Sequence, residues 1–459
     1  YPAVISGSGA FAKTGAGILK LTGANTFTAP VTNSAGTLQI GDNGTTGSLD
    51  ANIVNNAALI WHRSDDGLDY TGTISGTGTL DKKGTGMMVL RGNNSYSGAT
   101  TITEGRLSIT HANALGTTAG NTTVANGAQL RLGSSAGTAE PLVLNGTGYN
   151  NTGALYSPNG ANTVSGTITL GSAARINSDA ETLTLTGNIS GAYGLTFGGS
   201  ANITVNSVIG NVTAITKDGT GTLTLQSGQT HAFSGTATVS AGTMVQDALA
   251  SSMAVSVSSG ATLRGTGTNA AVSVTGTVDP GATAGAVGKL TGSSLTLNAG
   301  GALRVDVSNV AGTAGVNWDL FAASGNVAVG GAATIALYGN PTGWEPTAGY
   351  SWMVIDGGGT TAGEGKLSVD TNNFTAATDG GTFSVVKTGV DIYVVYCPRR
   401  PAAPVAFDAA AASVSSMTLT FTRNAQSDDV IIVSDLDGTF TEPTGAAPAV
   451  GAAFAGGTV

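Results

Sequence analysis

Residues 74–90 read Ile74-Ser-Gly-Thr-Gly-Thr-Leu-Asp-Lys82-Lys-Gly-Thr-Gly86-Met-Met-Val-Leu90, and this string has two further copies in the chain. The other copies are Ile5-Ser-Gly-Ser-Gly-Ala-Phe-Ala-Lys13-Thr-Gly-Ala-Gly17-Ile-Leu-Lys-Leu21 and Ile209-Gly-Asn-Val-Thr-Ala-Ile-Thr-Lys217-Asp-Gly-Thr-Gly221-Thr-Leu-Thr-Leu225. Each copy contains short runs in which apolar residues alternate with polar ones, a pattern that predicts strands with one buried face. Because strands this short can bury that face only by stacking on neighbours, the repeat predicts a parallel β-helix (a β-solenoid) over residues 1–396.

The composition agrees with an all-β repeat fold. Glycine accounts for 71 of 459 residues, charged residues make up 10% and hydrophobic residues 41%. This apolar content argues against a disordered chain, and glycine without a three-residue period argues against collagen. Glycine suits corners that need a positive φ, and we expect about 20–25 residues per coil, with Thr and Asn forming ladders on the outside. A set of all-β sandwiches is the alternative fold.

The repeated string continues as Lys-x-Gly-x-Gly-x-Leu-x-Leu-x-Gly-x-Asn-x-(Phe/Tyr)-x-Gly and ends in Gly-x-Leu, which resembles the passenger-associated repeat of bacterial autotransporters. The three matching segments are Lys13–Ile40, Lys82–Ile109 and Lys217–Val245. Ala29 stands where this repeat usually has glycine, and the third segment fits less closely. Residues 383–396 resemble the final coils of such passengers. The resemblance implies a secreted β-solenoid at a bacterial surface and says little about activity.

The composition changes at Cys397-Pro-Arg-Arg-Pro-Ala-Ala-Pro404, where three prolines predict a stiff linker over residues 397–404 that ends the solenoid. Three later segments have the pattern of sandwich strands: Val405–Phe407, Met417–Phe421 and Val430–Val433. Their order resembles the first half of a fibronectin type III-like module, and a full module needs ~100 residues. Residues 405–459 therefore predict a small, incomplete immunoglobulin/fibronectin III-like β-sandwich, whose remainder is missing, disordered or supplied by another chain.

Charge and residue counts argue against several classes of function. The formal net charge of −9 makes nucleic acid an unfavourable partner, because proteins that bind it neutralise phosphates with Lys and Arg. A single cysteine, Cys397, permits neither an internal disulfide nor a thiolate metal cluster, and His62, His111 and His231 are far apart in sequence. We expect no cofactor and no metal site. No apolar run reaches the length of a membrane helix, and the start at Tyr1 indicates a processed or excised piece.

Two stretches carry candidate chemistry. Asp435-Leu-Asp437-Gly resembles the nucleophile signature of haloacid-dehalogenase-like phosphatases, but neither Lys nor Asp follows it, so a turn is the favoured interpretation. The densest polar-aromatic cluster is Trp61-His-Arg-Ser-Asp-Asp66, which we expect to interrupt the repeat and form a loop off the rod. The favoured interpretation is a solvated insertion in which Trp61 covers the core edge, and the alternative is a loop that binds a sugar or Ca²⁺. The candidate ligand residues are Trp61, His62, Arg63, Asp65 and Asp66.

Lys13, Lys82 and Lys217 recur at one position of the repeat. This recurrence favours a structural role, such as salt bridges between coils or packing of the aliphatic stems. The sequence shows no serine-nucleophile signature, so we do not expect an enzyme.

The leading functional hypothesis is a non-enzymatic extracellular structural protein, a rod or a filament or coat subunit that joins its own copies or other surface components through its ends. Unpaired strand edges would make the joint. The candidate assembly residues are Tyr1, Pro2, Ala3, Val4, Ile5, Val430, Ile431, Ile432 and Val433. A second hypothesis is an adhesin for glycans or host surfaces with an exposed aromatic strip made of Trp61, Tyr70, Tyr149 and Tyr156. A third is a carbohydrate-active β-helix enzyme that depends on Asp65.

Overall fold

The computed structural model describes residues 1–399 apart from Ser234 and Ser251, together with four short strands beyond them. Those four are β45 (Ala406–Ser413), β46 (Ser416–Thr422), β47 (Ala453–Phe454) and β48 (Gly457–Thr458). The chain divides into two compact units. The first consists of residues 1–344, 350–376 and 383–395, and the second consists of residues 345–349, 377–382 and 396–459.

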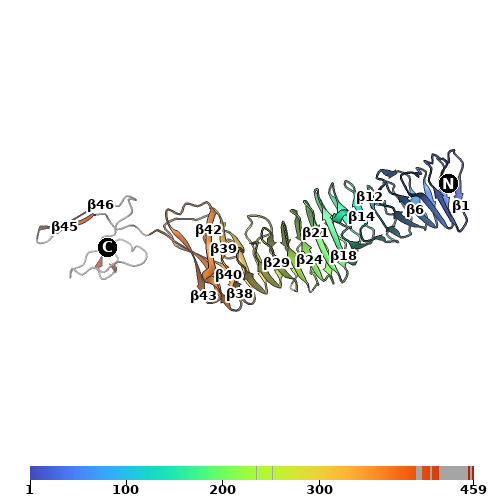
Figure 1. Cartoon of the computed structure of the whole chain (residues 1–459). Helices are drawn as coiled ribbons and strands as arrows, with labels where there is room; N and C mark the ends of the chain where they lie inside the picture. The colour runs from blue at the N-terminus through green and yellow to red at the C-terminus, as the bar shows by residue number, and fades with distance from the viewer. Residues whose placement is uncertain are drawn as a thin grey trace. The chain divides into compact units, whose positions relative to one another are not determined.

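The first unit is a parallel β-solenoid, which confirms the predicted fold class. Its strands stack one above another along the unit from the N-terminus onward (Figure 1), and the pairings from β1 to β42 are parallel. Thr37 pairs with Ala58 and Ala58 with Thr79, so one coil here takes 21 residues, as predicted. The described residues contain no α-helix, only the 3₁₀ turns η1 (Tyr149–Asn151) and η2 (Glu364–Lys366).

Two sheets begin at the N-terminal coils. A four-stranded sheet contains β1 (Phe11–Lys13), β3 (Val31–Asn33), β5 (Ile53–Asn55) and β8 (Ile74–Ser75). A 23-stranded sheet runs through most of the unit and contains β2 (Ile18–Leu21), β4 (Thr37–Gly44), β6 (Ala58–Arg63), β7 (Leu68–Tyr70), β9 (Thr79–Lys83), β10 (Met87–Leu90), β11 (Thr100–Ile102), β12 (Arg106–Ile109), β13 (Thr122–Val124), β14 (Gln129–Leu132), β15 (Leu142–Gly146), β16 (Leu155–Ser157), β18 (Ile168–Ser178), β20 (Ile189–Ser190), β21 (Gly194–Gly198), β23 (Ile209–Gly210), β24 (Ala214–Lys217), β26 (Thr236–Val239), β29 (Ala254–Val257), β32 (Ala271–Val274), β35 (Ser294–Leu297), β38 (Val327–Val329) and β41 (Thr361–Ala362).

Two further sheets belong to the later coils. A ten-stranded sheet contains β17 (Asn162–Val164), β19 (Thr182–Leu185), β22 (Asn202–Val205), β25 (Thr222–Leu225), β27 (Thr243–Gln246), β30 (Thr262–Gly265), β33 (Thr277–Pro280), β36 (Ala302–Asp306), β39 (Ala333–Gly339) and β42 (Leu367–Phe374). A seven-stranded sheet contains β28 (Leu249–Ala250), β31 (Thr268–Asn269), β34 (Lys289–Gly292), β37 (Leu320–Ala323), β40 (Tyr350–Gly357), β44 (Asp391–Cys397) and β43 (Thr382–Thr388).

The core is a continuous stack of inward side chains. Leu38, Leu59 and Leu80 stand in register on three consecutive coils, and all three are buried. Burying one such side chain contributes about 1.5–3 kcal/mol relative to leaving it exposed, so the stacking itself stabilises the coils. On the outside, the threonines at the same position of β19, β22 and β25 form one of the expected ladders. The aligned threonines are Thr184, Thr204 and Thr224.

Aromatic residues fill the end of the first unit, where the coils are longer. The ring of Trp344 stacks on that of Tyr350 at 4.9 Å, and Trp352 is fully buried beside Phe374 and Phe383. These large side chains pack on one another in the last coils of the unit.

In the second unit, the hydroxyl of Tyr396 donates to the carbonyl oxygens of Thr378 at 2.6 Å and Pro346 at 2.9 Å. Strands β45 and β46 pair antiparallel. Val430–Val433 and Asp435–Asp437 lie outside the described residues, as does most of 405–459. The fibronectin III-like sandwich, the linker and their boundaries therefore stay predictions.

Candidate functional site

Each of the three repeats contains a buried lysine near the end of a strand. Lys82 lies in β9, and its Nζ donates to the carbonyl oxygens of Lys83 at 3.0 Å and Gly84 at 2.8 Å. The same Nζ also donates to the carbonyl oxygen of Glu104, on the next coil, at 3.2 Å. Lys217 in β24 makes the equivalent three contacts. The amine therefore joins the turn of its own coil to the following coil.

These contacts confirm the predicted structural role of the lysines, although the partners are backbone carbonyls rather than carboxylates. Lys13 also lies against carbonyl oxygens, those of Gly15 and Ala35. Burial lowers the pKa of Lys82 and that of Lys217 to about 8, so both amines are still largely protonated at neutral pH and supply three donors each. Amines enclosed in this way are not free to hold a ligand.

A glycine completes each junction. Gly36, Gly105 and Gly242 follow the residue whose carbonyl the lysine binds, and their φ angles are 72°, 67° and 66°. A Cβ on Gly105 would lie 2.4 Å from the oxygen of Gly84 and 2.6 Å from that of Gly86. The lysine and the glycine of the repeat thus act together: the lysine hydrogen-bonds two consecutive coils, and the glycine lets their turns approach closely.

The cluster at residues 61–66 does not form the expected loop. Trp61, His62 and Arg63 belong to β6, and Trp61 is fully buried with its ring 5.0 Å from that of Tyr70. The reason is the alternation of β6, in which Leu59 and Trp61 both point inward. Only residues 64–66 turn away from the strand.

The charged residues of this cluster bind one another and the neighbouring turns. Arg63 pairs with Asp65 at 2.5 Å, and its two Nη atoms donate to the carbonyl oxygens of Gly47 at 3.0 Å and Thr45 at 2.8 Å. Asp66 pairs with Arg106 of β12. These arginines, through their hydrogen bonds, lower the pKa of both aspartates. Ionised and paired, neither carboxyl is suited to general acid catalysis.

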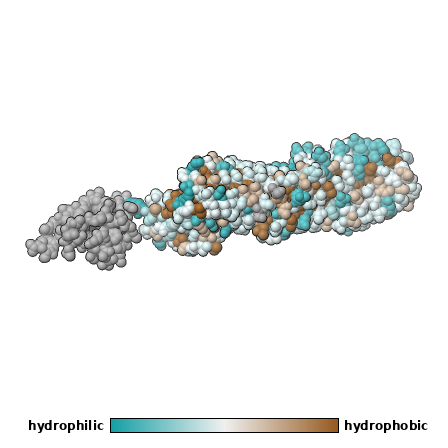
Figure 2. All heavy atoms as spheres, turned by 90° about the horizontal axis from the view of Figure 1, so that it is seen from below, coloured by the Kyte–Doolittle hydropathy of each residue, from teal (hydrophilic) through white to brown (hydrophobic). Residues whose placement is uncertain are grey.

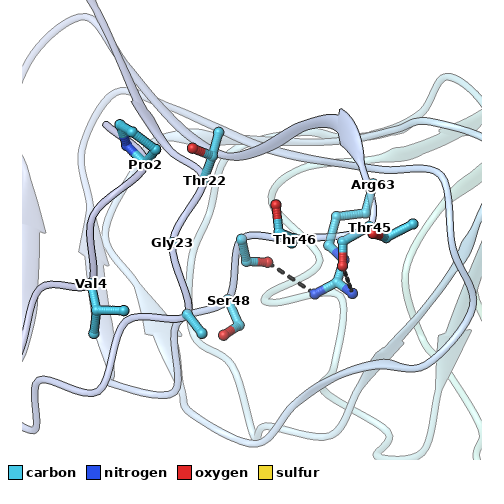
Figure 3. Close-up of a pocket in the computed structure, with 10 residues that line it drawn as sticks. Pro2, Val4, Thr22, Gly23, Thr45, Thr46, Ser48 and Arg63 are labelled. Atoms are coloured by element: carbon cyan, nitrogen blue, oxygen red, sulfur yellow. Dashed lines mark hydrogen bonds between the residues drawn. The ribbon is translucent and has the colours of Figure 1, made fainter.

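A pocket of about 390 Å³ lies beside Arg63 (Figure 3). Pro2 and Val4 line it together with Thr22, so the structure brings the candidate assembly segment and one candidate ligand residue together. The guanidinium donates hydrogen bonds to carbonyl oxygens of the turn at residues 45–48 and so stabilises that turn. This geometry favours a structural role for Arg63.

Arg63→Gln is expected to lower the free energy of unfolding by about 1–2 kcal/mol, because two carbonyl groups and Asp65 lose their donors. Urea unfolding measures the change. The control is Arg91→Gln, whose partner Asp69 is similarly exposed, so that only about 0–1 kcal/mol is lost. Equal stability of the two variants would contradict this stabilising role.

The expected aromatic strip is wrong for two of its four members. Trp61 and Tyr70 are fully buried, and the Tyr70 hydroxyl donates to the carbonyl oxygen of Ala51 at 2.9 Å. Tyr149 and Tyr156 are partly exposed on the outer face. The guanidinium carbon of Arg106 lies 4.5 Å from the centre of the Tyr149 ring.

The N-terminal segment already contacts the coil that follows it. The carbonyl oxygen of Tyr1 accepts from the amide of Thr22 at 3.0 Å, and that of Ile5 accepts from the amide of Thr26 at 2.9 Å. The side chains of Tyr1 and Val4 are 61% and 57% exposed. The role of Tyr1–Ile5 in assembly stays a prediction, and the other half of the candidate set, Val430–Val433, lies outside the described residues.

Sequence reasoning missed a buried cluster of acids. Asp279, Asp306 and Asp319 each place one carboxyl oxygen within 4.8 Å of the others. Arg264 donates to Asp279 at 2.7 Å, and Arg304 donates to both oxygens of Asp306 at 2.8 and 2.9 Å. Asp319 accepts two backbone amides, and burial raises its pKa to about 8.

Three carboxyls facing two arginines carry one excess negative charge, which a proton on Asp319 removes. The same oxygens are of the type that binds hard cations, but the arginines already occupy Asp279 and Asp306. Asp306 and Asp319 belong to the same coil, and Asp279 belongs to the coil before it. In the sequence, Arg264 and Asp279 each follow a buried apolar residue, and this alternation is a signal that could have revealed part of the cluster. The arrangement links coils and offers no open site for a substrate.

Among the described residues, the structure contains no helix long and apolar enough to cross a membrane.

Comparisons with known proteins agree with the repeat analysis. Residues 11–40, 80–109 and 215–245 match the family model described as the passenger-associated-transport-repeat, which confirms the three repeats predicted above. The protein named adhesin BmaC autotransporter, from Brucella suis biovar 1 (strain 1330), is 62% identical to this chain over 55 residues. Those residues are 12% of this chain and 2% of that protein, so the chain matches only a small part of its relative.

Proposed function

We propose that this passenger-type β-solenoid, a secreted protein of the bacterial cell surface, is a non-enzymatic structural rod whose copies join end to end. The observation that carries the proposal is that polar and charged side chains bind groups on neighbouring coils of the same chain. The repeat lysines, Arg63 and the buried aspartates all bind groups on neighbouring coils. Side chains committed in this way stabilise a long scaffold and leave no catalytic constellation among the described residues.

The first coil supports the end-to-end joint. Ile18 of β2 is 64% exposed, and among the described strands β2 pairs on one side with β4, where Ile18 stands in register with Thr37. An exposed apolar strand edge invites pairing with another strand. A second copy of the chain would cover Ile18 and extend the sheets by adding coils.

Electron microscopy of the purified chain tests the joint, and we expect end-to-end rods longer than one copy. Deleting Tyr1–Ile5 removes the candidate assembly segment at the N-terminus, and Ile18→Lys places a charge on the exposed edge without disturbing the core. Both changes are expected to yield single rods. Rods of unchanged length in both variants would contradict end-to-end assembly through this coil.

An adhesin is the second candidate function. One relative is named an adhesin, and Tyr149 and Tyr156 lie partly exposed on the outer face. Figure 2 shows hydrophilic and hydrophobic residues interspersed over one face of the first unit, a surface that suits contact with a polar ligand. The carbohydrate-active enzyme is less well supported, because Asp65 is paired with Arg63 and its pKa is lowered.

A further inference from the structure

Arg131 differs from the other arginines in its partners. Each of the others in residues 1–398 forms an ion pair with an aspartate: Arg63, Arg91, Arg106, Arg175, Arg264 and Arg304. The one acceptor that the described residues offer Arg131 is Sδ of Met87, 3.7 Å from its Nη1. A thioether is a weak acceptor, so this guanidinium retains donors for a stronger one.

The position of Arg131 follows from the stacking. It points outward from β14, and the register places Ser108 of β12 and Tyr156 of β16 beside it on the two adjacent coils. Met87 of β10 and Arg106 of β12 stand in register with each other and form the next row of outward side chains. The side chain of Arg131 is partly exposed, so its free donors are accessible from the outer face.

Two tyrosines on the same stretch of coils are held in place. The loop that carries Tyr149 is fixed because Nε2 of Gln129 donates to Oγ1 of Thr152 at 2.8 Å and to the carbonyl oxygen of Gly153 at 2.9 Å. The hydroxyl of Tyr156 donates to Asp179 at 2.9 Å. The rings therefore need little ordering when a ligand arrives.

The nearby carboxylates already have partners. Asp66 pairs with Arg106 and accepts the amide of Met87 at 2.8 Å, while Asp179 accepts the amide of Ser200 at 3.0 Å as well as the Tyr156 hydroxyl. The charge of Arg131 is thus left without a counter-charge, on a chain whose formal net charge is −9. An anionic group is the complementary ligand.

We propose that the Arg131 face (Met87, Arg106, Arg131, Tyr149 and Tyr156) binds an anionic saccharide. Its carboxylate or sulfate would accept hydrogen bonds from Arg131, and a sugar ring would pack on a tyrosine. This inference deepens the adhesin candidate and does not depend on end-to-end assembly, which microscopy tests separately.

Calorimetric titration tests the proposal with a heparin oligosaccharide as the sulfated probe, an oligogalacturonate as the carboxylated probe and a neutral malto-oligosaccharide as the control. We expect saturable binding of at least one anionic probe, weakened by added salt. Arg131→Gln is expected to raise Kd about tenfold or more, because a charged hydrogen-bond donor is lost. Arg91→Gln, which removes an outward arginine that already has a partner, is expected to leave Kd unchanged.

Three results would overturn the proposal. These are no saturable binding of either anionic probe, an equal loss of affinity in Arg91→Gln, and equally tight binding of polyglutamate. The unfolding midpoint of Arg131→Gln should match that of the unmodified chain, since only a thioether contact is removed. Preference for one anionic probe identifies sulfate or carboxylate as the natural group. Loss of binding with rods still forming would leave the structural proposal intact.

Discussion

Gly105→Ala is expected to destabilise the coils around β10 and β12 by about 2–5 kcal/mol. The left-handed φ of 67° costs an alanine about 1–2 kcal/mol. The added methyl group would also meet the backbone oxygens of Gly84 and Gly86 at 2.4 and 2.6 Å, and overpacking of this kind adds about 1–3 kcal/mol. Backbone atoms of the preceding turn cannot move aside as the end of a side chain can, so the coils must separate.

Gly127→Ala is the matched control for this change. Gly127 also has a positive φ, of 81°, but a Cβ there meets nothing within 4 Å. It should therefore lose only the conformational part, about 1–2 kcal/mol. Amide exchange in β10 and β12 should accelerate in Gly105→Ala and change little in Gly127→Ala. Equal losses in both variants would show that the coil-to-coil contact at Gly105 contributes nothing.

Glu140→Gln is expected to stabilise the protein at pH 8 by up to about 3 kcal/mol and to have little effect at pH 4. The Glu140 side chain is buried, and neither carboxyl oxygen has a hydrogen-bond partner among the described residues. Burial raises its pKa from 4.5 to about 7, against a smaller opposing effect of the Thr122 hydroxyl. One pKa unit corresponds to about 1.4 kcal/mol.

The sign follows from where the proton is held. Between pH 4.5 and about 7 the folded protein keeps the proton on Glu140, whereas the unfolded chain releases it. The contribution of this group to stability is therefore complete below pH 4.5 and is lost as the pH rises towards 7. Glutamine stays neutral at every pH and avoids the loss.

Thermal unfolding of the unmodified chain and of Glu140→Gln from pH 4 to pH 8 measures the effect. The two stability curves should diverge as the pH rises. The control is Glu364→Gln, because Glu364 is partly exposed and its pKa is lowered by a backbone hydrogen bond and by the charge of Lys387. Curves for Glu140→Gln that run parallel to those of the unmodified chain would contradict a buried, protonated Glu140.

Much of the architecture was predictable because its signals are local. Lys82, Gly84 and Gly86 lie within five residues of one another, and the alternation in Met87–Leu90 identifies a strand without reference to the rest of the chain. The same alternation was present in Ala58–Arg63, where the density of charged residues led to the wrong prediction of a loop. Leu59 and Trp61 are two residues apart and both point inward, and this alternation makes the segment a strand although its neighbouring residues are charged.

The polar sites were harder to predict, because their members come from different coils. Asp279 of the buried acid cluster lies 3.7 Å from the guanidinium of Arg304 on the next coil, a contact that no spacing in the sequence predicts. The Arg131 face likewise combines residues of several coils with Tyr149 from an inserted loop. The expected aromatic strip failed for Trp61 and Tyr70 because their rings fill the core.

The amino-acid sequence alone determined that this chain is a β-solenoid and where its repeats lie, because strand period and corner glycines are properties of residues close together in the chain. Only the tertiary structure decided which polar side chains meet. Partners on adjacent coils are separated by anything from 15 residues, as for Arg264 and Asp279, to more than 30, as for Asn326 and Thr360, which are 34 residues apart. Because coil length varies, the stacking register sets those pairings, and it is this register that leaves Arg131 without a carboxylate.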